Sequence, residues 1–242
     1  MQKVIGMVGY VNKTDLLINL AKVLTITGKS VLVIDGTVEE RVRYTIPAFV
    51  NQEKEYLANF DGVDYASGFM SIQAIKEYIF SKTQEEKTYD IILIDIDNVR
   101  AYDNFRQSGA FNKIFFYLEY TNISFNKNIQ LLDVISYYEQ FGEKSELRQV
   151  TCRQYVTRTS EKYFANIISR FPVKWNERVY ELPFLDQDRI ADIELQQSGY
   201  IDMKRHTKEF ISLVADVAAD ILEDVHAAEI RQMIKKYSRR RS

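Results

Sequence analysis

Residues 3–35 read KVIGMVGYVNKTDLLINLAKVLTITGKSVLVID and contain two apolar runs separated by a helix-like stretch. Residues 3–8 and 30–35 are short and almost continuously apolar, which is typical of strands buried on both faces. Between them, residues 14–27 carry apolar side chains at helical spacing, and Gly28 follows as a helix C-cap. A strand, a helix and a second strand in so short a span predict a βαβ unit and a parallel sheet.

The rest of the chain continues this alternation. Further strands are predicted at residues 89–95, 113–118, 147–152 and 178–182. Helices are predicted at residues 71–82, 124–141, 159–170 and 204–237. Residues 37–70 fit either a hairpin or an irregular excursion. The alternation predicts an α/β fold, namely a three-layer, doubly wound, mostly parallel sheet flanked by helices. No linker interrupts it, so we expect one domain over 1–228 and a tail at 229–242.

The composition is that of a globular protein in a reducing compartment. Of 242 residues, 46% are hydrophobic and 27% are charged, which excludes a disordered chain. A net charge of -2 excludes a general attraction to nucleic acid or anionic lipid, so such binding needs a local patch. Cys152 is the single cysteine, which excludes an internal disulfide and favours a small buried residue. No secretory signal or membrane-spanning run is recognisable, so a cytoplasmic protein is expected.

The turn between the first strand and the first helix, MVGYVNKT at residues 7–14, is a candidate phosphate-binding loop. Such a loop surrounds phosphates with backbone N–H groups, a Lys that neutralises charge and a Ser or Thr that holds Mg²⁺. Lys13 and Thr14 stand at those positions, and Gly9 is the one glycine retained. The alternative is that Lys13 and Thr14 are ordinary polar residues at a helix start.

Residues 12–35 resemble the start of the ParA/MinD-type (SIMIBI) P-loop ATPases, which read GKTTxxNLAxxLxxxGxxVLxID. The matching positions are Lys13, Thr14, Asn19, Leu20, Ala21, Leu24, Gly28, Val31, Leu32, Ile34 and Asp35. The run YDIILID at 89–95 looks like the family's Walker B strand, with Asp95 at the acidic position. The segment 181–191, ELPFLDQDRIA, resembles the family's late segment, in which a strand runs into Pro183 near the nucleotide base.

The resemblance implies ATP or ADP with Mg²⁺ as cofactor. The nucleotide-binding residues would be Gly9, Asn12, Lys13, Thr14 and Pro183. Thr14, Asp35 and Asp95 would hold the metal ion, because carboxylates at the carboxyl ends of strands are suitable Mg²⁺ ligands. The alternative is that Asp35, Asp95 and Asp97 simply end their strands.

Several departures from the family pattern concern the chemistry. The family's signature Lys, which reaches the partner's nucleotide across a dimer, falls on Val8, and two of its glycines fall on Tyr10 and Asn12. Side chains there restrict the backbone and fill space that phosphate oxygens need. Thr37 stands where the family has a second carboxylate, and a hydroxyl cannot act as its base. We therefore expect slow or absent hydrolysis, with no assigned catalytic residue. Nucleotide binding and a pseudo-ATPase with a solvated Lys13 both remain open.

The segment 229–242 reads as a basic amphipathic helix. Its apolar stripe is out of phase with the stripe of the preceding helix, and basic side chains flank it. The residues assigned to this tail are Ile230, Met233, Ile234, Lys235, Lys236, Tyr237, Arg239, Arg240 and Arg241. It predicts contact with an anionic membrane, as in MinD-like relatives, with the DNA backbone, or with a partner, or else a solvated tail. His206 and His226 are expected on the surface.

Three functions fit these features. The resemblance implies a spatial organiser or localisation factor for a membrane-associated, pilus or secretion machine, similar to the TadZ/CpaE-like factors, at the inner face of the membrane. The second is a nucleotide-free scaffold for protein–protein interaction. The third is a DNA or plasmid partition ATPase. The family forms homodimers, and Val8 in place of its signature Lys puts that particular dimer in question.

Overall fold

The sheet is built on the βαβ unit at the start of the chain. The computed structural model describes residues 2–49, 55–109, 111–141, 146–153 and 158–240. The strands are β1 (Lys3–Val8), β2 (Val31–Asp35), β3 (Leu57–Phe60), β4 (Val63–Ser67), β5 (Ile91–Ile96), β6 (Lys113–Glu119), β7 (Glu146–Arg153) and β8 (Lys174–Pro183). Their order in the sheet is β3-β4-β2-β5-β1-β6-β7-β8. All pairs are parallel except β3–β4, so the predicted mostly parallel sheet is confirmed.

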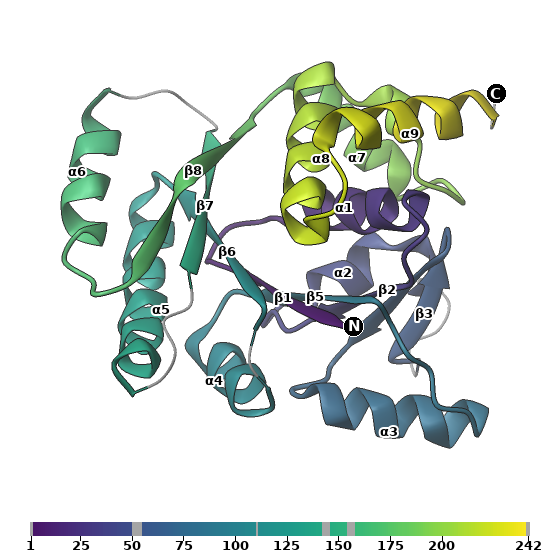
Figure 1. Ribbon diagram of the computed structural model, residues 1–242, viewed down its shortest axis with the longest axis horizontal. Coiled ribbons are helices and arrows are strands. Elements are labelled where there is room, and N and C mark those ends of the chain that lie inside the picture. The colour runs from purple at the N-terminus through teal and green to yellow at the C-terminus, as the bar shows by residue number, and fades with distance from the viewer. Residues whose placement is uncertain (1, 50–54, 110, 142–145, 154–157, 241–242) are drawn as a thin grey trace.

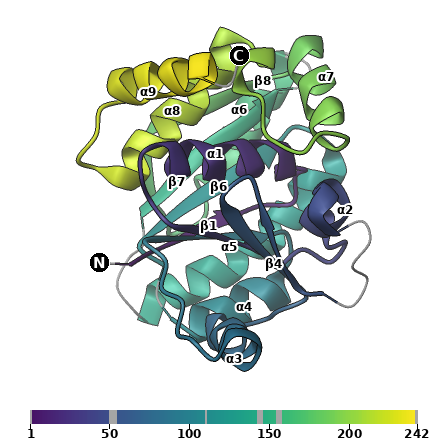
Figure 2. The same ribbon diagram turned by 90° about the vertical axis from the view of Figure 1, so that its right-hand side faces the viewer.

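Helices cover both faces of this sheet, which gives the predicted three layers (Figure 1). One face carries α1 (Thr14–Ile26), α8 (Lys208–Leu222) and α9 (Ala227–Arg240), and the other carries α3 (Ile72–Thr83), α4 (Val99–Gln107), α5 (Asn122–Phe141) and α6 (Arg158–Ile168). The shorter α2 (Arg41–Thr45) and α7 (Asp186–Leu195) lie beside α1 (Figure 2).

Successive strand residues belong to two different cores. In β5, Ile91 and Leu93 pack with the α1 side, whereas Ile92 and Ile94 pack with the α3–α6 side. Because side chains alternate across a strand, burial of both faces requires an apolar residue at every position. This is the physical reason for the near-continuous apolar runs of the central strands.

The C-terminal region differs from the expectation in two ways. The single helix predicted over 204–237 is two helices, because α8 ends at Leu222 and Glu223 adopts a left-handed conformation with φ 71°. The break redirects the chain, so the out-of-phase stripe of α9 also faces the core. Ile230 is 0% exposed and Ile234 is 4% exposed, within the same core as α1 and α8. Residues 230 and 234 thus contribute core side chains together with α1 and α8, while the division of the chain at residue 228 stays a prediction.

The region between β2 and β5 contains a β-hairpin, which is one of the two structures expected for residues 37–70. β3 and β4 are joined by Asp61 and Gly62, both with positive φ. Lys22 Nζ of α1 lies 3.0 Å from the Asp61 carboxylate and 4.8 Å from the ring centroid of Tyr237 in α9. The hairpin turn, α1 and α9 are thus held by one buried cation.

No helix among the described residues is long and apolar enough to cross a membrane.

Candidate functional site

The loop from Gly9 to Lys13 connects β1 to α1 at the carboxyl end of the sheet. Gly9 has φ +142°, and a Cβ on it would lie 2.3 Å from the backbone oxygen of Tyr117 in β6. Its N–H donates to the Ile96 carbonyl at 2.9 Å. Any side chain would force β1 and β6 apart. Close packing between strands is therefore sufficient to explain why this glycine is present.

Most backbone amides of this loop already have acceptors. The Tyr10 N–H donates to Asn128 Oδ1 of α5 at 2.7 Å, and the Val11 N–H donates to the Gly9 carbonyl at 3.0 Å. The Thr14 N–H donates to the Asn12 side chain at 3.2 Å. A phosphate cradle needs several convergent amides that are free to donate. Among the described residues, the amides without an acceptor here are those of Asn12 and Lys13 in the loop and of Asp15 and Leu16 in the first turn of α1.

Lys13 points into the protein interior. It is 2% exposed, and its Nζ lies 2.7 Å from Asp95 Oδ1. The same ammonium donates to the carbonyls of Gly9 at 2.8 Å and Ile96 at 3.3 Å. A buried ammonium is tolerated only when it is paired and hydrogen-bonded, and this one is. The expectation of a solvated Lys13 at the helix start is therefore wrong.

Asp95 is correspondingly a buried partner of Lys13. Burial raises the pKa of Asp95, and the ion pair with Lys13 opposes that rise. The Nζ–Oδ1 contact is short, but it lacks the alignment of a hydrogen bond, so Oδ1 is satisfied by charge alone.

The other two carboxylates at this edge hold the chain that follows β2. Asp35 accepts hydrogen bonds from the Thr37 N–H at 3.0 Å, the Thr37 hydroxyl at 2.6 Å and the Val42 N–H at 2.6 Å. Burial, and then the neighbouring Asp95, raises the pKa of Asp35 to about 6. Asp97 accepts from the Val38 N–H at 3.2 Å and lies 3.9 Å from Arg41.

These contacts test whether a Mg²⁺–nucleotide group fits the residues present. Asp35 Oδ1 and Oδ2 already accept hydrogen bonds, and Asp95 is paired with Lys13. Thr14 Oγ1 is buried and has no hydrogen-bond partner among the described residues, so its hydroxyl is free to meet such a group. The arrangement as a whole does not fit, because the lysine, the carboxylates and most amides are engaged within the protein.

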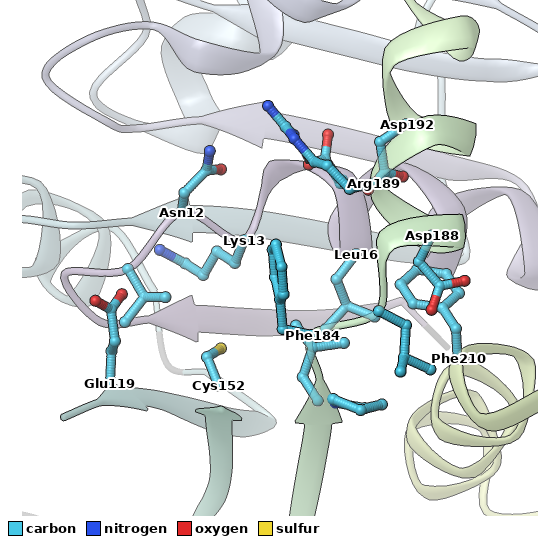
Figure 3. A pocket seen from close by; sticks show the side chains of 15 residues that line it. Asn12, Lys13, Leu16, Glu119, Cys152, Phe184, Asp188, Arg189, Asp192 and Phe210 are labelled. Carbon is cyan, nitrogen blue, oxygen red and sulfur yellow. Dashed lines mark hydrogen bonds and ion pairs between the residues drawn. The ribbon is translucent and has the colours of Figure 1, made fainter. Parts of the chain in front are cut away.

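A pocket of about 310 Å³ lies beside the loop, between α1, α7 and the carboxyl ends of β6, β7 and β8 (Figure 3). Its apolar side includes Leu16, Leu182, Phe184 and Phe210, and Pro183 also lines it. Cys152 contributes a thiol, which is buried and free as expected, and burial raises its pKa to about 12. The charged or polar lining residues are Asn12, Lys13, Asp15, Glu119, Asp188, Arg189 and Asp192.

The acidic part of the pocket joins α1 to α7. Arg189 Nη1 lies 3.1 Å from Asp15 Oδ2, and the carboxyl group of Asp192 lies near enough to Asp15 for the two to influence each other's ionisation. Burial, and then the proximity of Asp15, raises the pKa of Asp192 to about 8. The raised pKa favours the protonated form of Asp192 at neutral pH.

Asp188 and His206 lie behind this pair. Asp188 holds Thr207, the N-cap residue of α8, because it accepts from the Thr207 N–H at 2.7 Å and the Thr207 hydroxyl at 2.8 Å. His206 stacks on Phe210 with ring centroids 4.4 Å apart. It is buried, so the expected surface position of His206 is wrong, and its pKa is lowered by burial. His226, by contrast, is exposed as expected.

Sequence reasoning therefore identified the loop but not the groups around it. Asn128, which occupies a loop amide, and the Asp15–Arg189–Asp192 cluster were missed. Asn128 lies 118 residues from Tyr10, and no local pattern marks it. The acidic run DQDRIAD at 186–192 was visible, but only the fold brings it to α1.

Comparisons place this architecture among known structures. No protein-family model and no curated protein matches the chain by sequence. A ParA family ATPase from Chlorobium tepidum TLS aligns with a TM-score of 0.59 and 14% identity, over 90% of this chain and 97% of that chain. The MinC:MinD cell division protein complex of Aquifex aeolicus aligns with a TM-score of 0.57 and 14% identity, over 91% and 96%. Cobyrinic acid a,c-diamide synthase from Mycobacterium smegmatis, with bound ADP and magnesium, aligns at 0.55 and 15%, over 81% and 93%.

At such identities the likeness establishes architecture. The eight-stranded, mostly parallel sheet and its flanking helices are shared, whereas the loop contacts described above belong to this chain. This chain has the fold of the ParA/MinD-type P-loop ATPases.

Proposed function

We propose that this protein is a positioning or recruiting factor that uses the ParA/MinD-type fold as a scaffold and does not depend on ATP turnover. The fold supports the positioning role, since similar structures include a ParA family ATPase and a cell division MinD complex. The contacts of the phosphate loop support independence from ATP turnover, because its lysine and carboxylates are engaged within the protein. A machine such as a pilus, secretion or partition apparatus would then be recruited through the protein surface.

The observation that carries this proposal is the position of Lys13. Its ammonium forms three contacts inside the protein, with Asp95, Gly9 and Ile96, and is almost fully buried. A lysine that binds phosphate must present its charge to the ligand. Here the charge stabilises the edge of the sheet, so the loop acts as structure.

Calorimetric titration with ATP and ADP, each with Mg²⁺, tests the proposal. The wild type, Lys13→Ala and the matched surface control Lys76→Ala should all give no binding heat at millimolar nucleotide. Lys76 lies on α3, which covers the opposite face of the sheet. Binding in the wild type and in Lys76→Ala, with loss in Lys13→Ala, would overturn the proposal.

One observation favours a second candidate, a slow nucleotide-gated switch. Thr14 Oγ1 is buried without a hydrogen-bond partner among the described residues, and Arg41 and Arg189 line a hollow on the other side of the loop with Asn12. If Lys13 left Asp95, these groups would provide donors for a phosphate. The same titration separates the two candidates, because this switch requires Lys13-dependent binding.

The basic face of α9 is the candidate contact with an anionic surface. Arg231 lies 3.5 Å from Asp216, while Lys235, Lys236, Arg239 and Arg240 are exposed. Arg241 lies outside the described residues. Ile230 and Ile234 of the apolar stripe expected to enter a membrane are buried in the core instead, so we expect any contact to be mainly electrostatic. Co-sedimentation with anionic vesicles or with DNA, at rising salt, distinguishes the two surfaces.

That assay needs charge variants instead of a truncation. Lys235→Gln with Lys236→Gln leaves Ile230 and Ile234 in place, whereas deletion of 229–242 would remove core side chains. Binding that persists unchanged in the double variant would exclude this face. Sedimentation equilibrium with and without nucleotide tests the homodimer, which this proposal expects to be independent of nucleotide.

A further inference from the structure

His206 lies between two aspartates of α7, where α7 packs against the start of α8. Its side chain is 2% exposed and stacks on Phe210 of α8. His206 Nδ1 is 3.4 Å from Asp188 Oδ1, and His206 Nε2 is 3.9 Å from Asp192 Oδ1. Asp188 and Asp192 are one helical turn apart, so both face the same imidazole ring. These three side chains therefore join α7 to the segment that leads into α8.

Two buried polar atoms of this group lack hydrogen-bond partners among the described residues, namely His206 Nδ1 and Asp192 Oδ1. Asp188, by contrast, uses both of its oxygens to accept from Thr207. A closing movement of roughly 1 Å brings His206 Nε2 and Asp192 Oδ1 within hydrogen-bond distance. Because an unsatisfied buried polar atom is costly, a proton held between these two atoms is favourable. The ring hydrogen of the neutral imidazole is then on Nδ1 and faces Asp188.

The charges that act on His206 and Asp192 are mostly negative. They belong to Asp188 on α7, Asp202 before α8, Asp15 on α1 and the one cation of the set, Arg189 on α7. Arg189 is itself paired with Asp15, at 3.1 Å. No lysine or arginine among the described residues therefore forms an ion pair with Asp192.

The remaining charged residues near the start of α8 are engaged elsewhere or exposed. Arg205, which precedes His206 in the chain, pairs with Glu194 and lies 3.6 Å from Asp202. Lys208 and Glu209 begin α8 and are exposed. A negative charge on Asp192 would thus be left without a counter-charge from this side.

The protonation state of Asp192 therefore affects how well α7 packs. Burial, and then Asp15, raises the pKa of Asp192 to about 8, and burial lowers the pKa of His206 against the opposing charge of Asp188. At neutral pH both side chains are uncharged, which suits their buried positions. Above its pKa, Asp192 becomes a buried carboxylate beside two other aspartates, and movement of α7 away from them relieves the repulsion.

We propose that His206 and Asp192 form a proton-operated lock between α7 and α8, in which the neutral pair holds α7 in place and alkaline loss of its proton releases α7. This helix supplies Asp188, Arg189 and Asp192 to the wall of the 310 Å³ pocket, and it exposes Ile190 on its outer side. Release changes both the pocket wall and the surface offered to a partner. The lock needs no nucleotide, so it is independent of the proposed function.

NMR of the full chain with ¹³C-labelled histidine tests the lock directly, because the protein contains two histidines and the other, His226, is exposed. The His206 ring should still be neutral at about pH 6.5, where an unperturbed histidine is half protonated. Its signal should change again at about pH 8, when Asp192 ionises. The His226 signal should lack this alkaline change. A His206 signal without the alkaline change, or the same change in both signals, would overturn the proposal.

Hydrogen exchange measures the release of α7 itself. After correction for the intrinsic pH dependence of exchange, protection of residues 186–195 should fall at least about tenfold from about pH 6.5 to about pH 9, because each pH unit below the folded pKa favours the closed form about tenfold. Asp192→Asn should abolish this pH dependence, since an amide does not ionise. Asp186→Asn is the matched control, because Asp186 is exposed on the same helix, and it should retain the fall.

A fall in protection that persists in Asp192→Asn would contradict the lock. So would an equal fall in α3, on the opposite face of the sheet, because the whole domain would then be opening. If Asp192→Asn does not fold, the wild type decides alone. The His206 signal and the protection of α7 must then change at the same pH, and a change in one without the other overturns the proposal. Neither readout involves ATP, so such a failure leaves the scaffold proposal standing.

Discussion

The burial of α9 predicts that two isoleucines near the C-terminus are needed for stability. Ile230 is 0% exposed and Ile234 is 4% exposed, and both belong to the core formed with α1 and α8. Replacing either with Ala removes buried methyl and methylene groups and leaves a cavity, which costs about 2–4 kcal/mol. For a chain of this size each kcal/mol lowers Tm by about 2–4 °C, so a decrease of roughly 5–15 °C is expected.

Thermal and urea unfolding followed by circular dichroism would measure this change. Met233→Ala is the matched control, because Met233 is on the same helix and is 37% exposed. It should cost about 1 kcal/mol or less. If the free energies of unfolding of Ile230→Ala and Ile234→Ala both lie within about 0.5 kcal/mol of the wild-type value, α9 is not packed on the domain. The C-terminal segment would then again be a candidate for contact with a membrane or a partner, as expected from the sequence.

Three further predictions concern buried charges. Asp95→Asn leaves the Lys13 ammonium buried without its ion partner and should lower the free energy of unfolding, measured in urea, by about 3–5 kcal/mol. Adding Lys13→Met to the same chain should restore part of that stability. An unchanged free energy of unfolding in Asp95→Asn would contradict the stabilising ion pair. Asp220→Ala removes the acceptor shared by Lys113, Arg148 and Tyr180 and should lower the free energy of unfolding by a similar amount. Asp216→Ala on the same helix is the control. Its ion pairs are exposed, so it should cost under about 1 kcal/mol. The folded pKa of Asp192 is raised to about 8, so its stabilising contribution is complete below pH about 4 and is lost as pH rises through about 8. Tm measured across this range should therefore fall less in Asp192→Asn than in the wild type, and parallel curves would contradict the raised pKa of Asp192.

The fold could be read from the sequence because its main signal is local. Strands β1, β2, β5 and β6 lie between two helix layers, so their sequences are uninterrupted apolar runs. The helix α1 shows its period within one segment. The failures lie where the signal is weak or the chain breaks. The short α2 and α4 were not predicted, and α8 and α9 were merged because Glu223 ends a helix without glycine or proline.

The phosphate loop shows the same division at the level of single residues. Its position, between the first strand and the first helix, follows from the sequence, and so do the departures at Tyr10 and Asn12. The direction of the Lys13 side chain does not. Lys13 can face solvent, a ligand or the interior, and the choice depends on Asp95, more than 80 residues away in the chain.

The sequence by itself determined the α/β class, the parallel sheet and the location of the loop, because periodicity and burial on both faces are properties of contiguous residues. Only the tertiary structure decided which charges meet. It brought Lys13 to Asp95, Arg189 and Asp192 to Asp15, and Ile230 and Ile234 to the core. These contacts join residues far apart in the chain, and the energy of a buried charge depends on the partner that the fold supplies.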